Sequence, residues 1–437
     1  MLLFGHEHHQ PKLHRLGTHR ACAPRETYER WRGVARQLGV TRLANVTGLD
    51  VIGLPVWVAI RPNARGLSTS QGKGMDSDCA RVSAMMEAIE TWHAEHIELP
   101  VRVESAARLR RLHAAGGPAL VEPAQLARYA DVAQRDDAPL AWVQGWCLQQ
   151  QAPCWLPLEA VSTNYVAAGL PGAGIVPSSN GLASGNHLLE ATSHALAELV
   201  ERDAVALSGL PMREYRASLR IAPETVADPA CRTLLAMLEQ AGVMVALFDL
   251  TSDLGLPVMG ASIADRPDAS RWRTLPAFNG YGCHLEPAVA LMRALSEAVQ
   301  SRLTHISGSR DDISADDYAR GGNADDLAAI AQRIAQQRPQ RDFAARPALA
   351  GDSFEADVET LLAALRRAGL EQAVAVDLGQ PALGVPVVKL VVPGLGAPTP
   401  MLRARPLAAA TRRGAFLQHA LPAAARAAAP VQTVEVV

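Results

Sequence analysis

Ala80-Arg-Val-Ser83-Ala84-Met-Met-Glu87-Ala-Ile-Glu90 is the first of three copies of one sequence pattern. The other two are Ala191-Thr-Ser-His194-Ala195-Leu-Ala-Glu198-Leu-Val-Glu201 and Ala290-Leu-Met-Arg293-Ala294-Leu-Ser-Glu297-Ala-Val-Gln300. A glycine-containing segment precedes each copy: Gln71–Gly74, Asn180–Asn186 and Asn279–Gly282. A glycine loop that leads into a helix offers free backbone N–H groups and the positive end of the helix dipole, and both favour phosphate. The repetition therefore predicts a nucleotide site built from three glycine-loop/helix units.

Glutamates of the first two copies share one face of each predicted helix. At about 100° per residue, Glu87 and Glu90 lie roughly 60° apart, and Glu190, Glu198 and Glu201 span roughly 80°. Their neighbours are largely apolar, and inward-facing carboxylates repel one another unless cations lie between them. Because Mg²⁺ takes oxygen ligands and shares phosphate oxygens, we predict that these five glutamates bind Mg²⁺. The alternative is a set of solvated helix glutamates.

The roles of the basic residues near the three copies are less clearly determined by the sequence. Gly72-Lys73-Gly74 lacks the G-x-x-x-x-G-K-[ST] frame, so Lys73 is either a nucleotide contact or a solvated turn lysine. Arg202 is either a phosphate clamp or an internal ion-pair partner. The third copy ends in Gln300 instead of an acid, so it would contribute neutral or cationic contacts through Arg293 and Arg302.

Composition limits the class of protein. The 437 residues are 49% hydrophobic and 20% charged with a net charge of −2, an ordinary globular composition. This near-neutral balance argues against nucleic acid as the main partner. The six cysteines form no C-x-x-C pair and are predicted to be reduced thiols. With neither a signal-peptide pattern nor a membrane-spanning apolar run, we expect a cytoplasmic protein.

Periodicity predicts an α+β fold of mixed sheets and packed helices. The expected helices are 24–39, 324–337 and 354–368, and the expected strands are 41–47, 52–60, 141–148, 244–250, 257–264 and 385–392. The predicted organisation is an N-terminal segment (1–67), a domain that contains the three pattern copies (68–407) and a helical or loose tail (408–437). Five histidines crowd the first twenty residues, and we expect them in a solvated or loosely docked tail.

Four stretches resemble motifs of the YcaO family. They are Ser70–Glu90, Asn180–Asp203, Gly280–Arg302 and the late Pro386-Val-Val-Lys389-Leu-Val-Val-Pro393-Gly394-Leu395. The resemblance extends from about residue 20 to about residue 407, and it implies that 68–407 is an ATP-binding catalytic domain. It implies an ATP site in which Glu87, Glu90, Glu190, Glu198 and Glu201 hold Mg²⁺. It also implies nucleotide contacts from Lys73, Ser83, Ala183, Asn186, Arg202 and Arg293 or Arg302.

The same resemblance implies a reaction. Members of the family use ATP to phosphorylate a peptide-bond oxygen, after which a Cys or Ser side chain gives an azoline and external sulfide gives a thioamide. The N-terminal segments 17–27 and 41–50 look like the stand-alone branch that works with a TfuA partner, and the chain closes without a P-x-P-x-P end. These features favour thioamidation of a peptide with a TfuA-like sulfur-delivery partner. Azoline formation and a nucleotide-binding regulatory subunit without turnover are the alternatives, and the family analogy suggests a homodimer.

Overall fold

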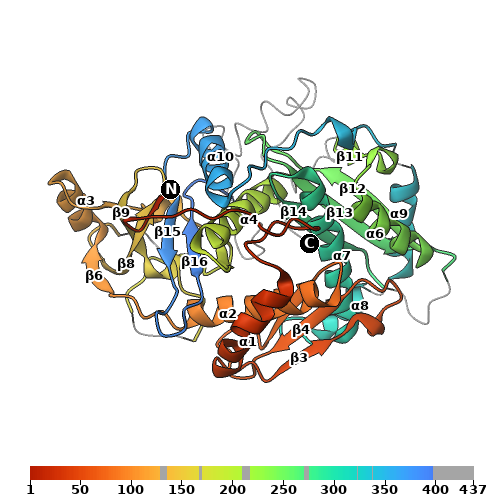
Figure 1. The fold of residues 1–437 in the computed structure, drawn as a ribbon, viewed down its shortest axis with the longest axis horizontal. Coiled ribbons are helices and arrows are strands. Elements are labelled where there is room, and N and C mark those ends of the chain that lie inside the picture. The colour runs from red at the N-terminus through yellow and green to blue at the C-terminus, as the bar shows by residue number, and fades with distance from the viewer. Residues whose placement is uncertain are drawn as a thin grey trace.

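The computed structural model shows a mixed α+β architecture in which helices lie between and over several sheets (Figure 1). It describes residues 1–127, 135–166, 170–208, 217–269, 275–321, 323–336 and 338–396. The predicted C-terminal tail, 408–437, lies outside this part of the chain. In the described part, the α+β class predicted from periodicity is confirmed.

The largest sheet has seven strands in the order β10-β16-β15-β8-β9-β7, with β6 paired to β8. The strands are β6 (Arg102–Ser105), β7 (Ala119–Leu120), β8 (Pro139–Cys147), β9 (Ala152–Pro157), β10 (Leu182–Ser184), β15 (Val374–Asp377) and β16 (Val387–Val391). β10 pairs antiparallel with β16, opposing Leu182 to Lys389. This pairing brings the second glycine segment beside the predicted late strand.

Two smaller sheets carry the other repeat units. One has the order β3-β4-β5 and the other β11-β12-β13-β14, all antiparallel. The strands are β3 (Arg42–Asn45), β4 (Val56–Ile60), β5 (Thr69–Lys73), β11 (Arg220–Ile221), β12 (Val243–Asp249), β13 (Val258–Asp265) and β14 (Phe278–Cys283). β5 and β14 are thus the strands that precede the first and third pattern copies.

Three long helices contain the pattern copies and join the sheets. They are α2 (Ser77–Glu95), α4 (Leu188–Ser208) and α7 (Pro287–Ser307). Figure 1 shows α4 near the centre, between the sheet that contains β15 and β16 and the sheet that contains β13 and β14. The other α-helices within the described residues are α1 (Pro24–Gln37), α3 (Ala106–Ala114), α6 (Pro229–Gln240), α8 (Ala315–Gly321), α9 (Ala324–Gln336) and α10 (Phe354–Arg367).

Gly72 of the first unit and Gly280 and Gly282 of the third lie within strands, not in loops as expected, and Gly74 directly follows β5. A Cβ at Gly72 would stand 2.0 Å from the Ala84 nitrogen, and a Cβ at Gly282 would stand 2.1 Å from the Ala290 carbonyl oxygen. Side chains there would push α2 and α7 off their strands. Close helix–strand packing, rather than a phosphate-binding loop, explains these glycines.

The N-terminal segment is docked, so the expectation of a loose tail is wrong for it. A short hairpin, β1 (Leu2–Leu3) and β2 (His6–Glu7), opens the chain, and Leu3 is fully buried. Lys12 forms a buried ion pair with Asp357 of α10, and its Nζ donates to the Gly351 carbonyl at 2.9 Å. This long-range partner was not visible from local sequence.

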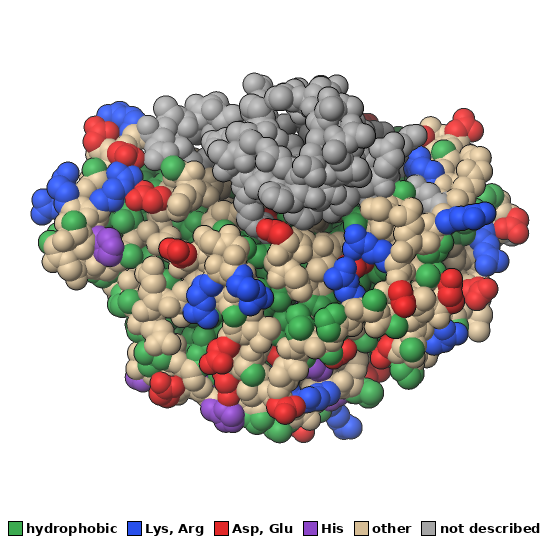
Figure 2. Space-filling model, turned by 90° about the horizontal axis from the view of Figure 1, so that it is seen from above, with side chains coloured by type: hydrophobic (Ala, Val, Ile, Leu, Met, Phe, Trp, Pro, Cys, Tyr) green, Lys and Arg blue, Asp and Glu red, His purple; other side chains and the backbone are tan. Residues whose placement is uncertain are grey.

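On the face drawn in Figure 2, acidic and basic side chains are interspersed over the described surface. Among the described residues, no helix is both long enough and apolar enough to cross a membrane.

Candidate nucleotide and metal site

Each of the five predicted metal ligands uses one carboxylate oxygen to accept a backbone N–H. The pairs are Glu87 with Gln71 (2.9 Å), Glu90 with Ser184 (2.8 Å), Glu190 with Asn186 (2.9 Å), Glu198 with Gly181 (3.1 Å) and Glu201 with Cys283 (3.0 Å). These donors lie on β5, β10 and β14 or directly beside β10. The contacts fix the direction of each carboxylate, and the second oxygen of Glu190 faces Arg20 while those of Glu198 and Glu201 face Arg202.

The contacts also link the three repeat units into a ring. Each helix packs on its own strand and on the strand of the next unit: α2 on β10, α4 on β14, and α7 on β5. The last polar residue of each copy makes the link: Glu90 to Ser184, Glu201 to Cys283, and the Gln300 amide to the Gln71 side-chain oxygen at 3.4 Å. We call this arrangement the three-unit ring.

Four of the predicted ligands lie close enough for their charges to interact. Burial, together with the charge of Glu198, raises the pKa of Glu87 to about 7, of Glu90 to about 8 and of Glu201 to about 7. Burial also raises the pKa of Glu198 itself. We call these four residues together with Glu297 the acidic cluster. Its donors are all hard oxygens held near one another, so the residues present fit Mg²⁺.

Glu297 was not among the predicted ligands, although it occupies the same place in the third copy as Glu87 and Glu198. The Nζ of Lys73 lies 3.3 Å from its carboxylate, and its charge acts on Glu198 and Glu201. The matching position in the repeat was the sequence signal that could have identified Glu297 as a ligand. Lys73 therefore lies at the acidic cluster, as its predicted role requires.

Glu190 stands apart from the acidic cluster, toward the N-terminal segment. Its carboxylate is buried and lies 3.7 Å from the Nε of Arg20, a residue that the sequence did not single out. This position suits a cation bound at the edge of the site rather than among the other four acids.

Arg202 pairs with the acidic cluster. One of its terminal nitrogens lies 3.6 Å from Glu198 and 3.9 Å from Glu201. Burial would lower the pKa of Arg202, but Glu201, Glu198 and Glu297 together raise it above its ordinary value. The Nε of Arg202 is buried with no hydrogen-bond partner among the described atoms. Arg202 is thus an ion-pair partner with a donor to spare for a phosphate.

Arg293 and Arg302 differ sharply, although the sequence treated them as alternatives. Arg293 donates to the Cys283 carbonyl at 3.0 Å, and burial, helped by the charge of Arg20, lowers its pKa to about 10. Arg302 is 1% exposed and bonds Asp50 and Asp265, each at 2.9 Å. Because its guanidinium is committed to this buried ion pair, we do not include Arg302 in the nucleotide site.

Three other predicted nucleotide contacts have different surroundings. The Asn186 side chain accepts from Trp31 Nε1 at 3.2 Å and donates to Thr27 Oγ1 at 2.9 Å, so it is tied to α1. Ala183 is buried on β10, where it takes the helix-packing place of the glycines in the other units. Ser83 is exposed on α2.

Lys389 is a further polar residue at the site. Its Nζ is buried and donates to the carbonyls of Ser178 and, at 2.7 Å, Asn180. Burial lowers its pKa to about 8, although the charge of Glu198 opposes the shift. The lysine fixes the segment whose next residue, Gly181, donates to Glu198. A lysine inside the otherwise apolar β16 was the sequence feature that could have indicated a buried polar role for Lys389.

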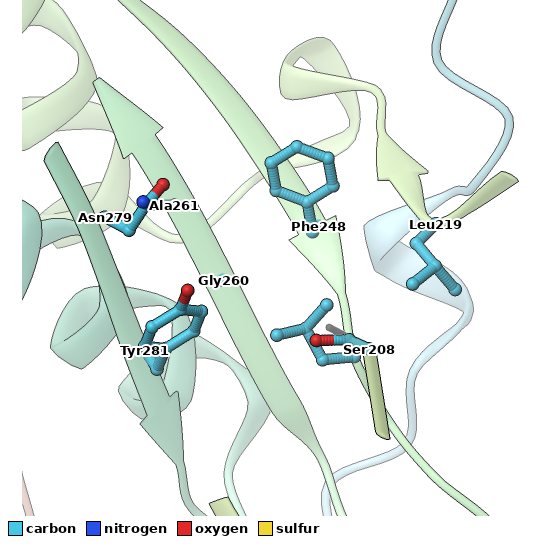
Figure 3. A pocket seen from close by; sticks show the side chains of 8 residues that line it. Ser208, Leu219, Phe248, Gly260, Ala261, Asn279 and Tyr281 are labelled. Atoms are coloured by element: carbon cyan, nitrogen blue, oxygen red, sulfur yellow. The ribbon is translucent and has the colours of Figure 1, made fainter. Parts of the chain in front are cut away.

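A separate hollow lies on the four-stranded sheet (Figure 3). Tyr281 and Phe248 line it together with Leu219 and Ser208. Tyr281 belongs to the third glycine segment, but the flanking Gly280 and Gly282 face α7. All residues that line this hollow are uncharged, so it lacks the carboxylates that a magnesium site needs.

Comparison with known proteins identifies the family of the chain. Residues 71–396 match the family model described as YcaO cyclodehydratase, ATP- and Mg²⁺-binding. A protein of Rhizobium leguminosarum bv. trifolii, "Uncharacterized protein in tfuA 3'region", is 36% identical over 389 residues, which cover 86% of this chain and 88% of that protein.

Two solved structures share the fold. "The structure of YcaO from Methanopyrus kandleri bound with AMPPCP and Mg2+" has a TM-score of 0.67 at 25% identity and covers 89% of this chain and 95% of that one. A "Heterocyclase in complex with substrate and Cofactor" has a TM-score of 0.73 at 23% identity and covers 90% of this chain. The present chain spans about half (54%) of that heterocyclase. Together with the family model, these findings establish that the chain belongs to the YcaO family of ATP- and Mg²⁺-binding, peptide-modifying enzymes.

Proposed function

We propose that the protein uses ATP to phosphorylate the oxygen of a peptide backbone amide, so that a nucleophile can attack the amide carbon. One observation supports this most: backbone N–H groups orient five buried or half-buried carboxylates near Lys73, Arg202 and Arg293. An amide oxygen is a poor leaving group, whereas phosphate is a good one, so phosphorylation solves the chemical problem.

We assign the acidic residues to Mg²⁺ and the basic residues to phosphate. The acidic cluster and Glu190 would hold Mg²⁺, which when bound would neutralise phosphate oxygens. Lys73 and the spare donor of Arg202 would bind phosphate directly. Arg293, held by the Cys283 carbonyl, would stabilise negative charge on the transferring group. Lys389 positions the segment that orients Glu198.

Thioamide formation is the product that we favour. The relative from Rhizobium is named for its place beside tfuA and is 36% identical to this chain. This supports a TfuA-like partner that delivers sulfur. We further propose a homodimer by analogy with the family. We place the reaction in the cytoplasm, which fits six cysteines that are all free.

Peptides encoded beside the gene provide the test. The purified protein is incubated with ATP, Mg²⁺, sodium sulfide and each peptide, and ADP release and peptide mass are measured. We expect peptide-dependent ADP release and replacement of one oxygen by sulfur. Glu198→Gln should abolish both, whereas Glu239→Gln, at an exposed residue of α6, should not. Loss of water would indicate an azoline, and tight ATP binding without turnover would indicate a regulatory subunit.

A further inference from the structure

The N-terminal segment crosses the molecule before α1 begins, and we call its residues 8–20 the N-terminal strap. Figure 1 shows this dark red stretch passing from the sheet of β15 and β16 over α4 before the chain turns back to α1. At one end of the strap, the His8 ring lies 5.4 Å from the His187 ring, measured between centroids. At the other end, the Nε of Arg20 lies 3.7 Å from the carboxylate of Glu190. The strap therefore ends at a predicted metal ligand.

Lys12 fastens the strap to α10. Its side chain is fully buried, its ammonium pairs with Asp357, and its Nζ donates to the Gly351 carbonyl at 2.9 Å. Asp357 also accepts the Gly351 N–H at 2.9 Å. Burying two charges carries a desolvation cost that an apolar side chain of similar size would avoid. The charged pair therefore favours a role in fixing one position of the strap.

The path from this anchor to Arg20 is short. Two backbone hydrogen bonds join His14 and Arg20, from the His14 N–H to the Arg20 carbonyl at 3.0 Å and from the Arg20 N–H to the His14 carbonyl at 2.9 Å. The backbone of Arg20 thus lies opposite a residue only two positions after Lys12. The His19 ring also packs edge to face on His284, with 4.7 Å between centroids. A shift of the strap at Lys12 would therefore move Arg20.

Arg20 in turn contacts the nucleotide site. One oxygen of Glu190 accepts the Asn186 N–H at 2.9 Å, and the other faces the guanidinium of Arg20. Burial, and after it the charge of Arg20, lowers the pKa of Arg293 to about 10, so both arginines bring positive charge to this end of the site. Without Arg20 in place, Glu190 would lose one of the two contacts that fix its carboxylate.

We propose that Lys12 is a positioning residue of the nucleotide site: by pairing with Asp357, it holds the strap so that Arg20 keeps Glu190 in place. This assignment rests on the nucleotide site of the proposed function. It differs from a purely structural role in a measurable way. A structural ion pair changes only the stability of the fold, whereas a positioning pair changes nucleotide affinity, and does so only while Arg20 is present.

A double-mutant cycle tests this dependence. Calorimetry measures the Kd of AMPPCP at one saturating Mg²⁺ concentration for the wild type, Lys12→Met, Arg20→Gln and the double variant. We expect Arg20→Gln to raise the Kd about tenfold, the effect of losing one charged contact. Lys12→Met should raise it about three- to tenfold. The Kd of the double variant should equal that of Arg20→Gln, because Lys12 then has no arginine left to position.

Arg61→Met is the matched control. Arg61 forms a buried ion pair with Glu95 at 2.7 Å, and neither residue belongs to the acidic cluster. This variant should lower the free energy of unfolding, as Lys12→Met does, but leave the Kd unchanged. Hydrogen exchange at residues 9–20 should be faster in Lys12→Met than in the wild type and unchanged in Arg61→Met. Should Lys12→Met fail to fold, Asp357→Asn weakens the same pair and keeps an acceptor for the Gly351 N–H.

Different outcomes separate this assignment from the proposed function. An equal Kd in Lys12→Met and the wild type overturns the positioning role. Effects of Lys12→Met and Arg20→Gln that add in free energy overturn it as well. In both cases, AMPPCP binding by the wild type leaves the nucleotide site standing. A wild type that does not bind AMPPCP refutes the nucleotide site, and the positioning role with it, even if hydrogen exchange shows that Lys12 fastens the strap.

Discussion

Magnesium binding should release protons from the acidic cluster, and the number released follows from the structure. Glu87, Glu90 and Glu201 have pKa values of about 7, 8 and 7 without metal. At about pH 6 each is at least nine-tenths protonated, so binding that needs all three ionised releases between two and three protons. The logarithm of the Mg²⁺ association constant should therefore rise with a slope of between two and three near about pH 6, and level off above about pH 9.

Calorimetry measures this release. Mg²⁺ is titrated into protein saturated with AMPPCP at several pH values, in pairs of buffers with different ionisation enthalpies. Glu90→Gln should release about one proton fewer than the wild type at about pH 7, because Glu90 has the highest pKa of the three. Protons released by the nucleotide are the same for the wild type and Glu90→Gln, so they cancel in the difference between the two. The control Glu239→Gln should release as many protons as the wild type. Release of fewer than about half a proton at about pH 6, or equal release from both proteins, would refute the argument.

Stability without metal follows from the same groups. Their pKa values are raised above the ordinary 4.5, so the folded state binds more protons than the unfolded state between about pH 4.5 and 8. Urea unfolding of the metal-free protein should thus show stability falling as pH rises through this window, and Mg²⁺ should restore it. Arg302→Met should cost about 3–5 kcal/mol, because it removes the buried cation that pairs with Asp50 and Asp265, and the ATP affinity of the folded protein should stay unchanged. Lost ATP affinity at unchanged stability would instead place Arg302 in the nucleotide site. Gly282→Ala should lower the free energy of unfolding by at least about 1–3 kcal/mol, because the new Cβ would meet the Ala290 carbonyl. Gly33→Ala, in an open position of α1, is the control and should be neutral or stabilising. Equal unfolding midpoints of the two variants would contradict this prediction. Glu297→Gln should weaken Mg²⁺ binding about tenfold in the same calorimetric titration, and an unchanged affinity would remove Glu297 from the acidic cluster.

Local periodicity predicted the elements well. The helix expected over 354–368 is α10, Phe354–Arg367, and the strand expected over 257–264 is β13, Val258–Asp265. Such elements are set by the spacing of apolar residues within one segment, which the sequence displays directly. The prediction of loops was wrong for Gly72, Gly280 and Gly282 because glycine serves both tight turns and close helix packing, and sequence alone does not separate the two.

Residue roles at the site were predictable only where the repeat determined them. The predicted glutamates follow from the pattern. Glu297 was not predicted because the third copy has Gln300 where the others have a second acid, although Glu297 itself matches Glu87 and Glu198. Arg302 and Asn186 were assigned by resemblance, yet their partners, Asp50 and Trp31, lie far away in sequence. Pairings of that range depend on the tertiary fold and leave no local signal.

The three-unit ring has a consequence for synthesis on the ribosome. The link from α7 back to β5 joins residues separated by 229 positions, from Gln300 to Gln71. The first unit therefore emerges long before the helix that closes it. A nascent chain that stops short of α7 would carry the first two acidic helices but no complete nucleotide pocket. ATP binding should appear abruptly, and late, as the growing chain lengthens.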